Sequence, residues 1–121
     1  MILEIPAGET ISFKAGQYLD ILLSGKHCPF SIASSPDITD TIELHIKPTP
    51  GSADSVEIEK ILDLAVSVDI ELPKGDCFLE TPIDKNLILI GASTGITQMK
   101  SMIEFLLPRN PEHSIWLYWG V

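Results

Sequence analysis

The sequence lacks any apolar run long enough to cross a membrane. Its longest apolar stretches, at positions 21–23, 87–90 and 115–119, are far shorter than the ~20 residues that a membrane-spanning helix needs. A basic patch is also missing, and the net charge of −9 makes nucleic acid a poor partner. The N-terminal residues show neither the basic segment nor the cleavage site of a secretory signal. These absences favour a cytoplasmic protein that acts on small molecules.

Cysteine is scarce, and its placement excludes the usual metal sites. Cys28 and Cys77 are far apart in the sequence and match no zinc or disulfide spacing, so two reduced cytoplasmic thiols are expected. His27, His45 and His113 share no spacing with one another or with carboxylates, so we expect neither a metal site nor a histidine base. The serine-hydrolase elbow and the Walker phosphate loop are absent as well.

Alternating apolar and polar residues dominate the first two thirds of the chain. With 121 residues, 45% of them hydrophobic, the chain can bury a core. The pattern predicts strands at 2–5, 18–23, 30–33, 41–47 and 66–72, and a helix at 55–64 capped by Asp54 or Ser55. Because Pro29 cannot donate to a sheet ladder, the strand that starts at Phe30 is expected at an edge or a bulge. Such a series of short strands is typical of an antiparallel barrel.

The pattern changes after a polar linker at 81–86. Leu87–Ile90 is continuously apolar, which is typical of a strand in a parallel sheet. A glycine-containing turn at 91–95, a helix at 96–107 and a strand at 114–119 follow, so the segment predicts one β-α-β unit. Trp116, Tyr118 and Trp119 are expected to pack in this sheet or at an interface. One helix cannot cover both faces of the sheet, so we expect a homo-oligomer that associates through residues 87–121.

Two stretches of sequence carry a family resemblance. Phe13-Lys14-Ala15-Gly16-Gln17-Tyr18 and Cys28-Pro29-Phe30-Ser31 together resemble the flavin-binding barrel of the ferredoxin-NADP reductase superfamily, and within it the NAD(P)H-flavin reductases most of all. The resemblance implies a mainly β protein with an α/β C-terminal part. Residues 1–84 would form an incomplete Greek-key antiparallel flavin-binding barrel without its N-terminal strand region. Residues 85–121 would form the first β-α-β unit of an NAD(P)-binding domain, so the chain resembles the middle of such a protein with both ends missing.

The resemblance also implies functions for the residues of the second stretch. Phe30 would pack against the flavin, and Ser31 would be the catalytic residue, with its hydroxyl beside the flavin nitrogen that receives the hydride. Cys28 and Pro29 would complete this part of the site, and Cys28 stands where the family has an arginine that binds flavin phosphate. Because a thiol cannot replace that forked, charged contact, we expect flavin to bind weakly. Read without the family, Phe30 and Ser31 also suit an ordinary barrel strand.

Two further motifs follow in the order of the family. His45-Ile46-Lys47 and Ser55 resemble the strand and loop that approach the pyrophosphate, although an ordinary capped helix start explains the loop equally well. Gly91, Thr94, Gly95 and Thr97 resemble the turn that approaches the nicotinamide nucleotide, where glycine lets the backbone come close to a ligand. A glycine-containing turn alone is a weak signal, and its position between a buried strand and a helix strengthens it.

The function that the resemblance implies is hydride transfer between NADH or NADPH and a flavin. The flavin would be FAD, FMN or riboflavin, and the nicotinamide nucleotide would be a co-substrate. Two other hypotheses stay open: a non-catalytic or partner-dependent part of such a reductase, and a barrel that binds another ligand without flavin. Whether this chain alone is an enzyme is therefore also open.

Overall fold

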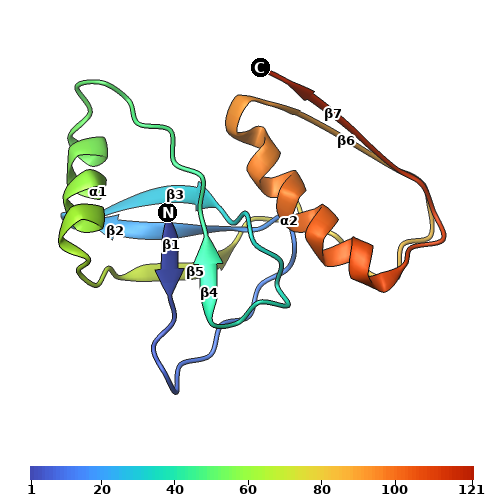
Figure 1. Ribbon diagram of the computed structural model, residues 1–121, viewed down its shortest axis with the longest axis horizontal. Helices are drawn as coiled ribbons and strands as arrows, with labels where there is room; N and C mark the ends of the chain where they lie inside the picture. Colours follow the sequence, from blue (N-terminus) through green and yellow to red (C-terminus); the bar gives the residue numbers. More distant parts are fainter.

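Seven strands and two α-helices form two parts that lie side by side in the computed structural model, which describes residues 1–121 (Figure 1). The first five strands and the first helix form the barrel part, and the remaining elements form a β-α-β unit. The elements are β1 (Ile2–Glu4), β2 (Tyr18–Leu23), β3 (Lys26–Ser31), β4 (Thr41–Glu43), α1 (Ala53–Leu64), β5 (Ile70–Lys74), β6 (Leu87–Ala92), α2 (Ile96–Leu106) and β7 (Ile115–Gly120).

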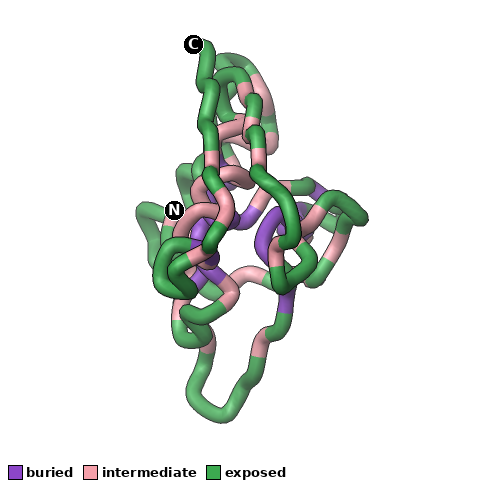
Figure 2. The backbone as a smooth tube through the Cα atoms, turned by 90° about the vertical axis from the view of Figure 1, so that its right-hand side faces the viewer, coloured by how far each residue is buried: buried purple, intermediate pink, exposed green.

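The barrel part is built from antiparallel pairs around β2. Strand β2 lies between β3 and β5, and β1 pairs with β4 in a second, two-stranded sheet. A bridge between Ile32 and Leu44 joins the two sheets. Alternate residues of β2 point inward, and the buried positions gather at the centre of the molecule (Figure 2). The core cluster contains Phe13, Leu19, Ile21, Leu23, Cys28, Ile32, Ile42, Leu44 and Ile58.

The strand that carries Pro29 begins earlier than predicted. Strand β3 starts at Lys26, and Pro29 lies inside it, opposite Asp20 of β2. The expectation of an edge is confirmed, because β3 pairs only with β2. Proline is tolerated there because one side of an edge strand makes no ladder hydrogen bonds.

Three other predicted boundaries were wrong. Strand β4 ends at Glu43 rather than at position 47, since only Leu44 finds a further bridge partner. Strand β5 begins at Ile70 rather than at 66. Ile70 pairs with Ile21, and before it only the Asp69 carbonyl oxygen bonds β2, accepting the Leu22 N–H at 2.9 Å. Helix α1 is capped by Ser52, whose hydroxyl accepts the Ser55 N–H at 3.4 Å, and not by Asp54 or Ser55.

The C-terminal part is the predicted β-α-β unit. Strands β6 and β7 are parallel and pair along their whole length, and α2 lies along one side of them (Figure 1). On the other face, Ile88 and Ile90 are 64% and 72% exposed, next to the half-exposed Trp116 and Tyr118. The expectation of an uncovered sheet face is therefore confirmed, because one helix shields only one face.

Helix α2 also joins the β-α-β unit to the barrel part. The buried Ser101 hydroxyl donates to the carbonyl oxygen of Ser34 at 2.7 Å. Met102, also buried, packs over Gly16, and the two terminal nitrogens of Arg109 donate to the two carboxylate oxygens of Asp37 at 2.6 and 2.8 Å. We call this contact between α2 and the barrel part the seam.

Gly16 is the position where the seam tolerates no side chain. Its φ is +109°, and a Cβ there would lie 2.5 Å from Met102 Cε and 2.6 Å from the Cys77 carbonyl oxygen. We expect Gly16→Ala to lower the free energy of unfolding by about 3 kcal/mol, since strain and a backbone clash act together. Urea unfolding followed by circular dichroism measures the change.

Gly25→Ala is the matched control for this prediction. Gly25 also has a positive φ, +77°, but a Cβ there would meet nothing within 4 Å. Its replacement should cost only the backbone strain, about 1 kcal/mol. An equal loss of unfolding free energy in Gly16→Ala and Gly25→Ala would show that the seam does not depend on close contact at Gly16.

Candidate functional site

A cleft of about 630 Å³ lies between the barrel part and the start of α2. It brings together five residues that the sequence predicted for the site, in two groups far apart in the chain. His45, Ile46 and Lys47 form one wall, and Thr94 and Thr97 belong to the opposite wall. The remaining lining residues are Met1, Leu44, Ser93, Ile96, Trp119 and Val121.

The barrel wall of the cleft supplies one charged and one titratable side chain. His45 Nε2 lies 2.7 Å from Glu43 Oε1, and this hydrogen bond, more than the nearby Lys100 ammonium, holds the pKa of Glu43 below its ordinary value. Lys47 is exposed and makes no ion pair in the structure. The wall therefore presents a free cation to the cleft.

The opposite wall contains a buried hydroxyl without a partner. Thr94 lies in the 3-10 turn Ser93–Gly95, and Thr97 lies in the first turn of α2. Thr97 is only 2% exposed, and its Oγ1 makes no hydrogen bond. Leaving a buried hydroxyl unpaired costs about 1–3 kcal/mol. The hydroxyl oxygen itself is buried, so it lies behind the surface of the cleft rather than on it.

The two glycines of this turn differ in what requires them. A Cβ on Gly91 would lie 2.8 Å from Met99 Cε, so Gly91 allows α2 to pack closely on β6. Gly95 has a φ of −60°, which any residue adopts, and a Cβ there would meet nothing within 4 Å. Only at Gly95 does the structure leave open space that a ligand can approach.

The predicted residues of β3 lie next to the cleft rather than in its wall. Phe30 and Ser31 are half-buried, Pro29 is exposed, and none of the three lines the cleft. Ser31 is followed directly by Ile32, which bridges to Leu44 in the cleft wall. The end of β3 therefore leads toward the barrel side of the cleft.

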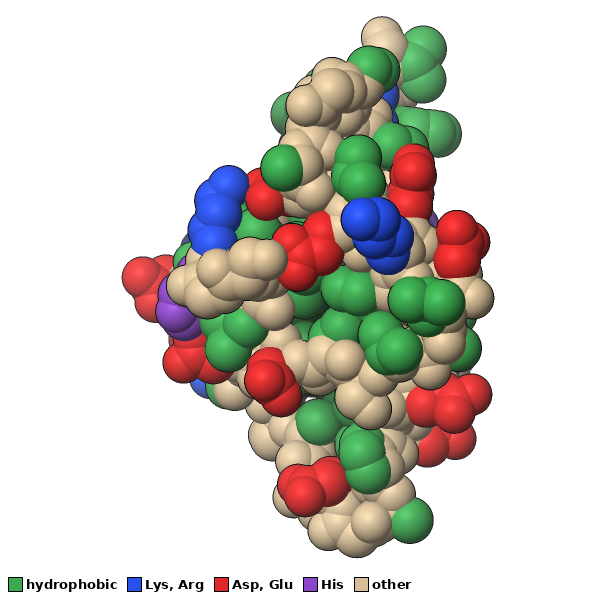
Figure 3. Space-filling model, turned by 90° about the vertical axis from the view of Figure 1, so that its left-hand side faces the viewer, with side chains coloured by type: hydrophobic (Ala, Val, Ile, Leu, Met, Phe, Trp, Pro, Cys, Tyr) green, Lys and Arg blue, Asp and Glu red, His purple; other side chains and the backbone are tan.

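The groups around the start of α1 satisfy one another. Burial raises the pKa of the Cys28 thiol, and the neighbouring Asp54 carboxylate raises it further. Lys26 Nζ lies 2.8 Å from Asp54 Oδ2 and lowers the pKa of that carboxyl. The Ser55 hydroxyl accepts the Thr49 N–H at 2.9 Å. Figure 3 shows the α1 side of the molecule, with acidic side chains spread over it. A phosphate placed beside Cys28 would find the Lys26 ammonium already paired with Asp54.

One titratable cluster was missed by the sequence analysis. The structure places His27 Nδ1 2.9 Å from Glu71 Oε2 and 3.2 Å from Asp20 Oδ2. Pairing of β2 with β3 and β5 creates the cluster, which sequence spacing does not reveal. Lys74 Nζ lies 2.8 Å from Asp20 and lowers its pKa, so an ammonium group already compensates these acids.

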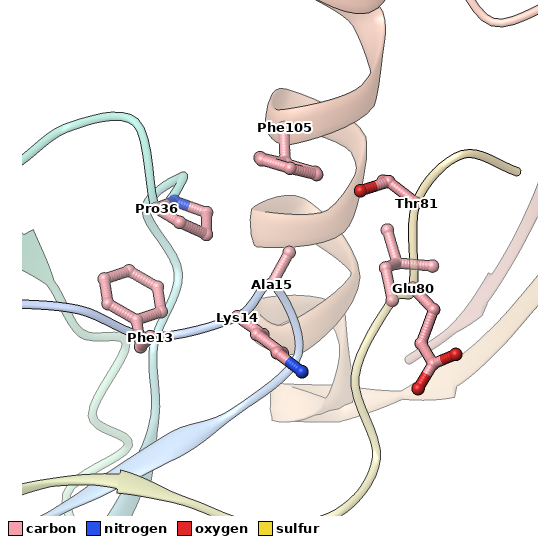
Figure 4. A pocket seen from close by; sticks show the side chains of 8 residues that line it. Phe13, Lys14, Ala15, Pro36, Glu80, Thr81 and Phe105 are labelled. Atoms are coloured by element: carbon pink, nitrogen blue, oxygen red, sulfur yellow. The ribbon is translucent and has the colours of Figure 1, made fainter.

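A second pocket, of about 300 Å³, lies on the seam and contains none of the predicted site residues. Pro36 and Phe13 lie on one side of it, Thr81 and Glu80 lie on the other, and Phe105 of α2 lies between them (Figure 4). No buried polar side-chain atom without a hydrogen-bond partner lies in it. We therefore take the larger cleft as the candidate site.

Trp119 is the cleft residue whose role the sequence analysis missed. It was expected to pack in the sheet or an interface, but it is 53% exposed and lines the cleft. Its indole Nε1 donates to the carbonyl oxygen of Ser93 at 2.9 Å. Only the register of β6 and β7 places it there, so no local sequence signal identifies it.

Neither α-helix is both long and apolar enough to span a bilayer. No family model matches the chain. Sequence relatives do exist. A probable flavin reductase from Aliivibrio fischeri is 35% identical over 97% of this chain, and an NAD(P)H-flavin reductase from Vibrio harveyi is 34% identical over 91% of it. The chain spans about half the length of these relatives, 51% and 49% respectively.

Solved structures show the same arrangement of elements. An Amycolatopsis cytochrome P450 reductase superposes with a TM-score of 0.80 and 29% identity, over 99% of this chain and 37% of that one. A ferredoxin-NADP⁺ reductase from Plasmodium falciparum superposes with a TM-score of 0.71 and 18% identity, over 100% of this chain and 55% of that one. Over the residues that it spans, the chain is thus a homologue of the NAD(P)H-flavin reductases with the fold of the ferredoxin-NADP reductase superfamily.

Proposed function

We propose that this chain takes part in hydride transfer from NADH or NADPH to a flavin, and that the transfer occurs at the cleft between the barrel part and α2. The observation that carries the proposal is the meeting of the two predicted motifs in one cleft, His45–Lys47 on one wall with Thr94 and Thr97 on the other. The names of the sequence relatives support the same reaction class.

The contribution of the chain is positioning. A bound flavin supplies the two-electron acceptor that no protein side chain provides. Phe30 is proposed as the platform for the ring, Ser31 as the hydrogen-bonding group at the reacting nitrogen, and Thr94-Gly95 as the wall on the nucleotide side. A hydride carries both electrons of the bond that it leaves, so the transfer itself needs no acid or base. The chain has to hold the two rings in contact and keep water out.

The residues fit the rings of such ligands better than their phosphates. The open space at Gly95, between the cleft residues Thr94 and Ile96, leaves room for a ligand. At the start of α1, Cys28 and Asp54 offer a thiol and a carboxylate where a flavin phosphate needs a cation. We therefore propose a weakly bound, exchangeable flavin, whether riboflavin, FMN or FAD.

We further propose that the two parts of the chain bind different ligands. Residues 1–84 serve as the flavin-binding part and residues 85–121 as the NAD(P)-facing part. Both cysteines are free thiols, which is the form that the cytoplasm maintains, so we assign the activity to that compartment.

Removal of the Ser31 hydroxyl tests the proposed reaction. We expect Ser31→Ala to lower the rate of NADH oxidation in the presence of riboflavin about tenfold, which is the equivalent of one lost hydrogen bond. The rate is measured from the decrease in NADH absorbance, with a thermal melt to verify folding. Ser12→Ala, in an exposed loop, is the control and should retain the full rate.

Two outcomes would contradict the proposed function. The first is a chain that neither changes the visible spectrum of added flavin nor oxidises NADH, which would favour a barrel that binds another ligand. The second is an unchanged rate in Ser31→Ala, which would remove Ser31 from the reacting site.

A cation at position 28 tests the proposed weakness of phosphate binding. We expect Cys28→Arg to tighten FMN more than riboflavin, by about tenfold, because only FMN carries a phosphate. Quenching of flavin fluorescence gives both dissociation constants. Asp54→Asn removes the negative charge beside Cys28 and leaves the buried Cys28 side chain unchanged. It should therefore also shift the ratio of dissociation constants in favour of FMN over riboflavin.

Cys77→Arg is the control for this comparison, because it adds the same charge at an exposed position. It should leave the ratio of the two dissociation constants unchanged. Equal tightening of FMN and riboflavin in Cys28→Arg would show that the phosphate does not approach position 28.

The uncovered face of the β6–β7 sheet is proposed as a contact between two copies of the chain. Neither strand contains a charged residue, and both strands have a free edge. Charged residues are a common means of keeping sheet edges apart, and their absence favours pairing. Mutual coverage of this face would bury on the order of 1,000 Å², the lower end for specific interfaces.

Sedimentation velocity at micromolar concentration tests this association. We expect a dimer that Ile90→Lys converts to a monomer, because the substitution would bury an unpaired charge in the interface. Val66→Lys is the matched control, since Val66 is also exposed but lies outside the sheet. A chain that sediments as a monomer before any substitution would refute the association.

A further inference from the structure

The carboxylate of Glu43 contacts both parts of the molecule. Glu43 is the last residue of β4, and its Oε1 lies 2.7 Å from Nε2 of His45 in the wall of the cleft. Its Oε2 lies 3.1 Å from the ammonium nitrogen of Lys100, which belongs to α2. One side chain of the barrel part therefore bridges a residue that lines the cleft and the helix that packs across the seam.

Backbone hydrogen bonds hold Glu43 in this place. Its N–H donates to the Ser34 hydroxyl at 3.1 Å, and its carbonyl oxygen accepts the Ala33 N–H at 2.8 Å. The Ser34 carbonyl oxygen accepts the buried hydrogen bond from Ser101, which directly follows Lys100. Connected hydrogen bonds of this kind reinforce one another in a partly buried setting. The ion pair between Glu43 and Lys100 thus forms between two segments that the seam already keeps close together.

The charges around Glu43 keep it ionised at neutral pH. The hydrogen bond from His45, more than the one from Lys100, holds the pKa of Glu43 below its ordinary value. Burial acts against the charge of Lys100, but its hydrogen bonds with Glu104, 2.7 Å away, and with Glu43 outweigh burial and raise its pKa. Because an ionised carboxylate can only accept hydrogen bonds, His45 Nε2 carries a proton and donates it to Glu43.

We infer that Glu43 is a positioning residue, which couples the docking of α2 on the barrel part to the orientation of the His45 ring in the cleft. With Lys100 in place, one carboxylate oxygen is held by α2 and the other accepts from the ring. Without Lys100, the carboxylate is free to rotate and the ring loses its fixed acceptor. Lys100 therefore acts on the cleft although it does not line it. The effect on ligand binding rests on the proposed function, whereas the coupling is a property of the chain itself.

Nuclear magnetic resonance of the His45 ring tests the coupling without a ligand. The ring signals are assigned by their loss in His45→Gln. We expect Lys100→Met to shift these signals when it is introduced into the unsubstituted chain. The same substitution should leave them in place when it is introduced into Glu43→Gln, because its effect passes through the carboxylate. Equal shifts in both backgrounds, or no shift in either, would overturn the inference.

Riboflavin affinity tests the consequence for binding. We expect Glu43→Gln to raise the dissociation constant for riboflavin about fivefold, since a neutral amide holds His45 and Lys100 more weakly than a carboxylate does. Lys100→Met should raise it about threefold, and the double variant should match Glu43→Gln alone. Quenching of flavin fluorescence gives the constants. Multiplied effects in the double variant would show that the two residues act independently, which would overturn the inference.

Two further variants separate positioning from a general effect on stability. Lys100→Arg retains the cation, so both the His45 signals and the dissociation constant should stay as in the unsubstituted chain. Lys85→Met removes an exposed cation of the linker before β6 and should also change neither quantity. A dissociation constant that follows the melting temperature across all these variants would indicate a purely structural role and overturn the inference.

The two kinds of measurement keep this inference distinct from the proposed function. If riboflavin does not bind to the unsubstituted chain, the proposed function fails, and the His45 signals still decide whether Glu43 couples the ring to α2. If riboflavin binds and NADH reduces it, but the dissociation constant is the same in the unsubstituted chain and in Glu43→Gln, the proposed function stands and the inference is refuted.

Discussion

The candidate site depends on how α2 is held against the barrel. The cleft has one wall in each part, so its width is set where the two parts touch. The buried hydrogen bond from Ser101 to Ser34 fixes the position of α2, because a displaced helix would leave both groups unpaired away from water. Met102 over Gly16 fixes the approach distance. The Arg109–Asp37 pair is partly exposed, and it contributes less to stability than to orientation.

Charge is distributed unevenly between the start of α1 and the cleft. At the start of α1, Lys26 is paired with Asp54, and the buried Cys28 beside them adds no charge because burial raises its thiol pKa. In the cleft, Lys47 has no acidic partner. At α1, the partial positive charge of the helix N-terminus is compensated by the Asp54 carboxylate in the first turn. In the cleft, the Lys47 ammonium group stays available to a ligand.

The features that the sequence predicted correctly follow from local patterns, whereas the features that it did not predict depend on tertiary contacts. The bounds of β2 and the parallel pairing of β6 with β7 followed from apolar periodicity, because the same side chains that form the pattern are the ones that pack. The strand ends at Glu43 and Ile70 could not be predicted, since they depend on which residues pair with the partner strand. In the site, motif order pointed to Thr97, but the place of Trp119 in the cleft depends on the register of β6 and β7.

The uncovered β6–β7 sheet gives the molecule an uneven local stability. Each of these strands is bonded only to the other, and α2 shields one face of the pair, whereas β2 is bonded on both sides within the core. Backbone amides of β6 and β7 should therefore exchange with solvent through local opening, while those of β2 exchange only when the whole domain unfolds. The wall of the cleft that belongs to the β-α-β unit is consequently the part of the chain whose order responds most to whatever binds against it.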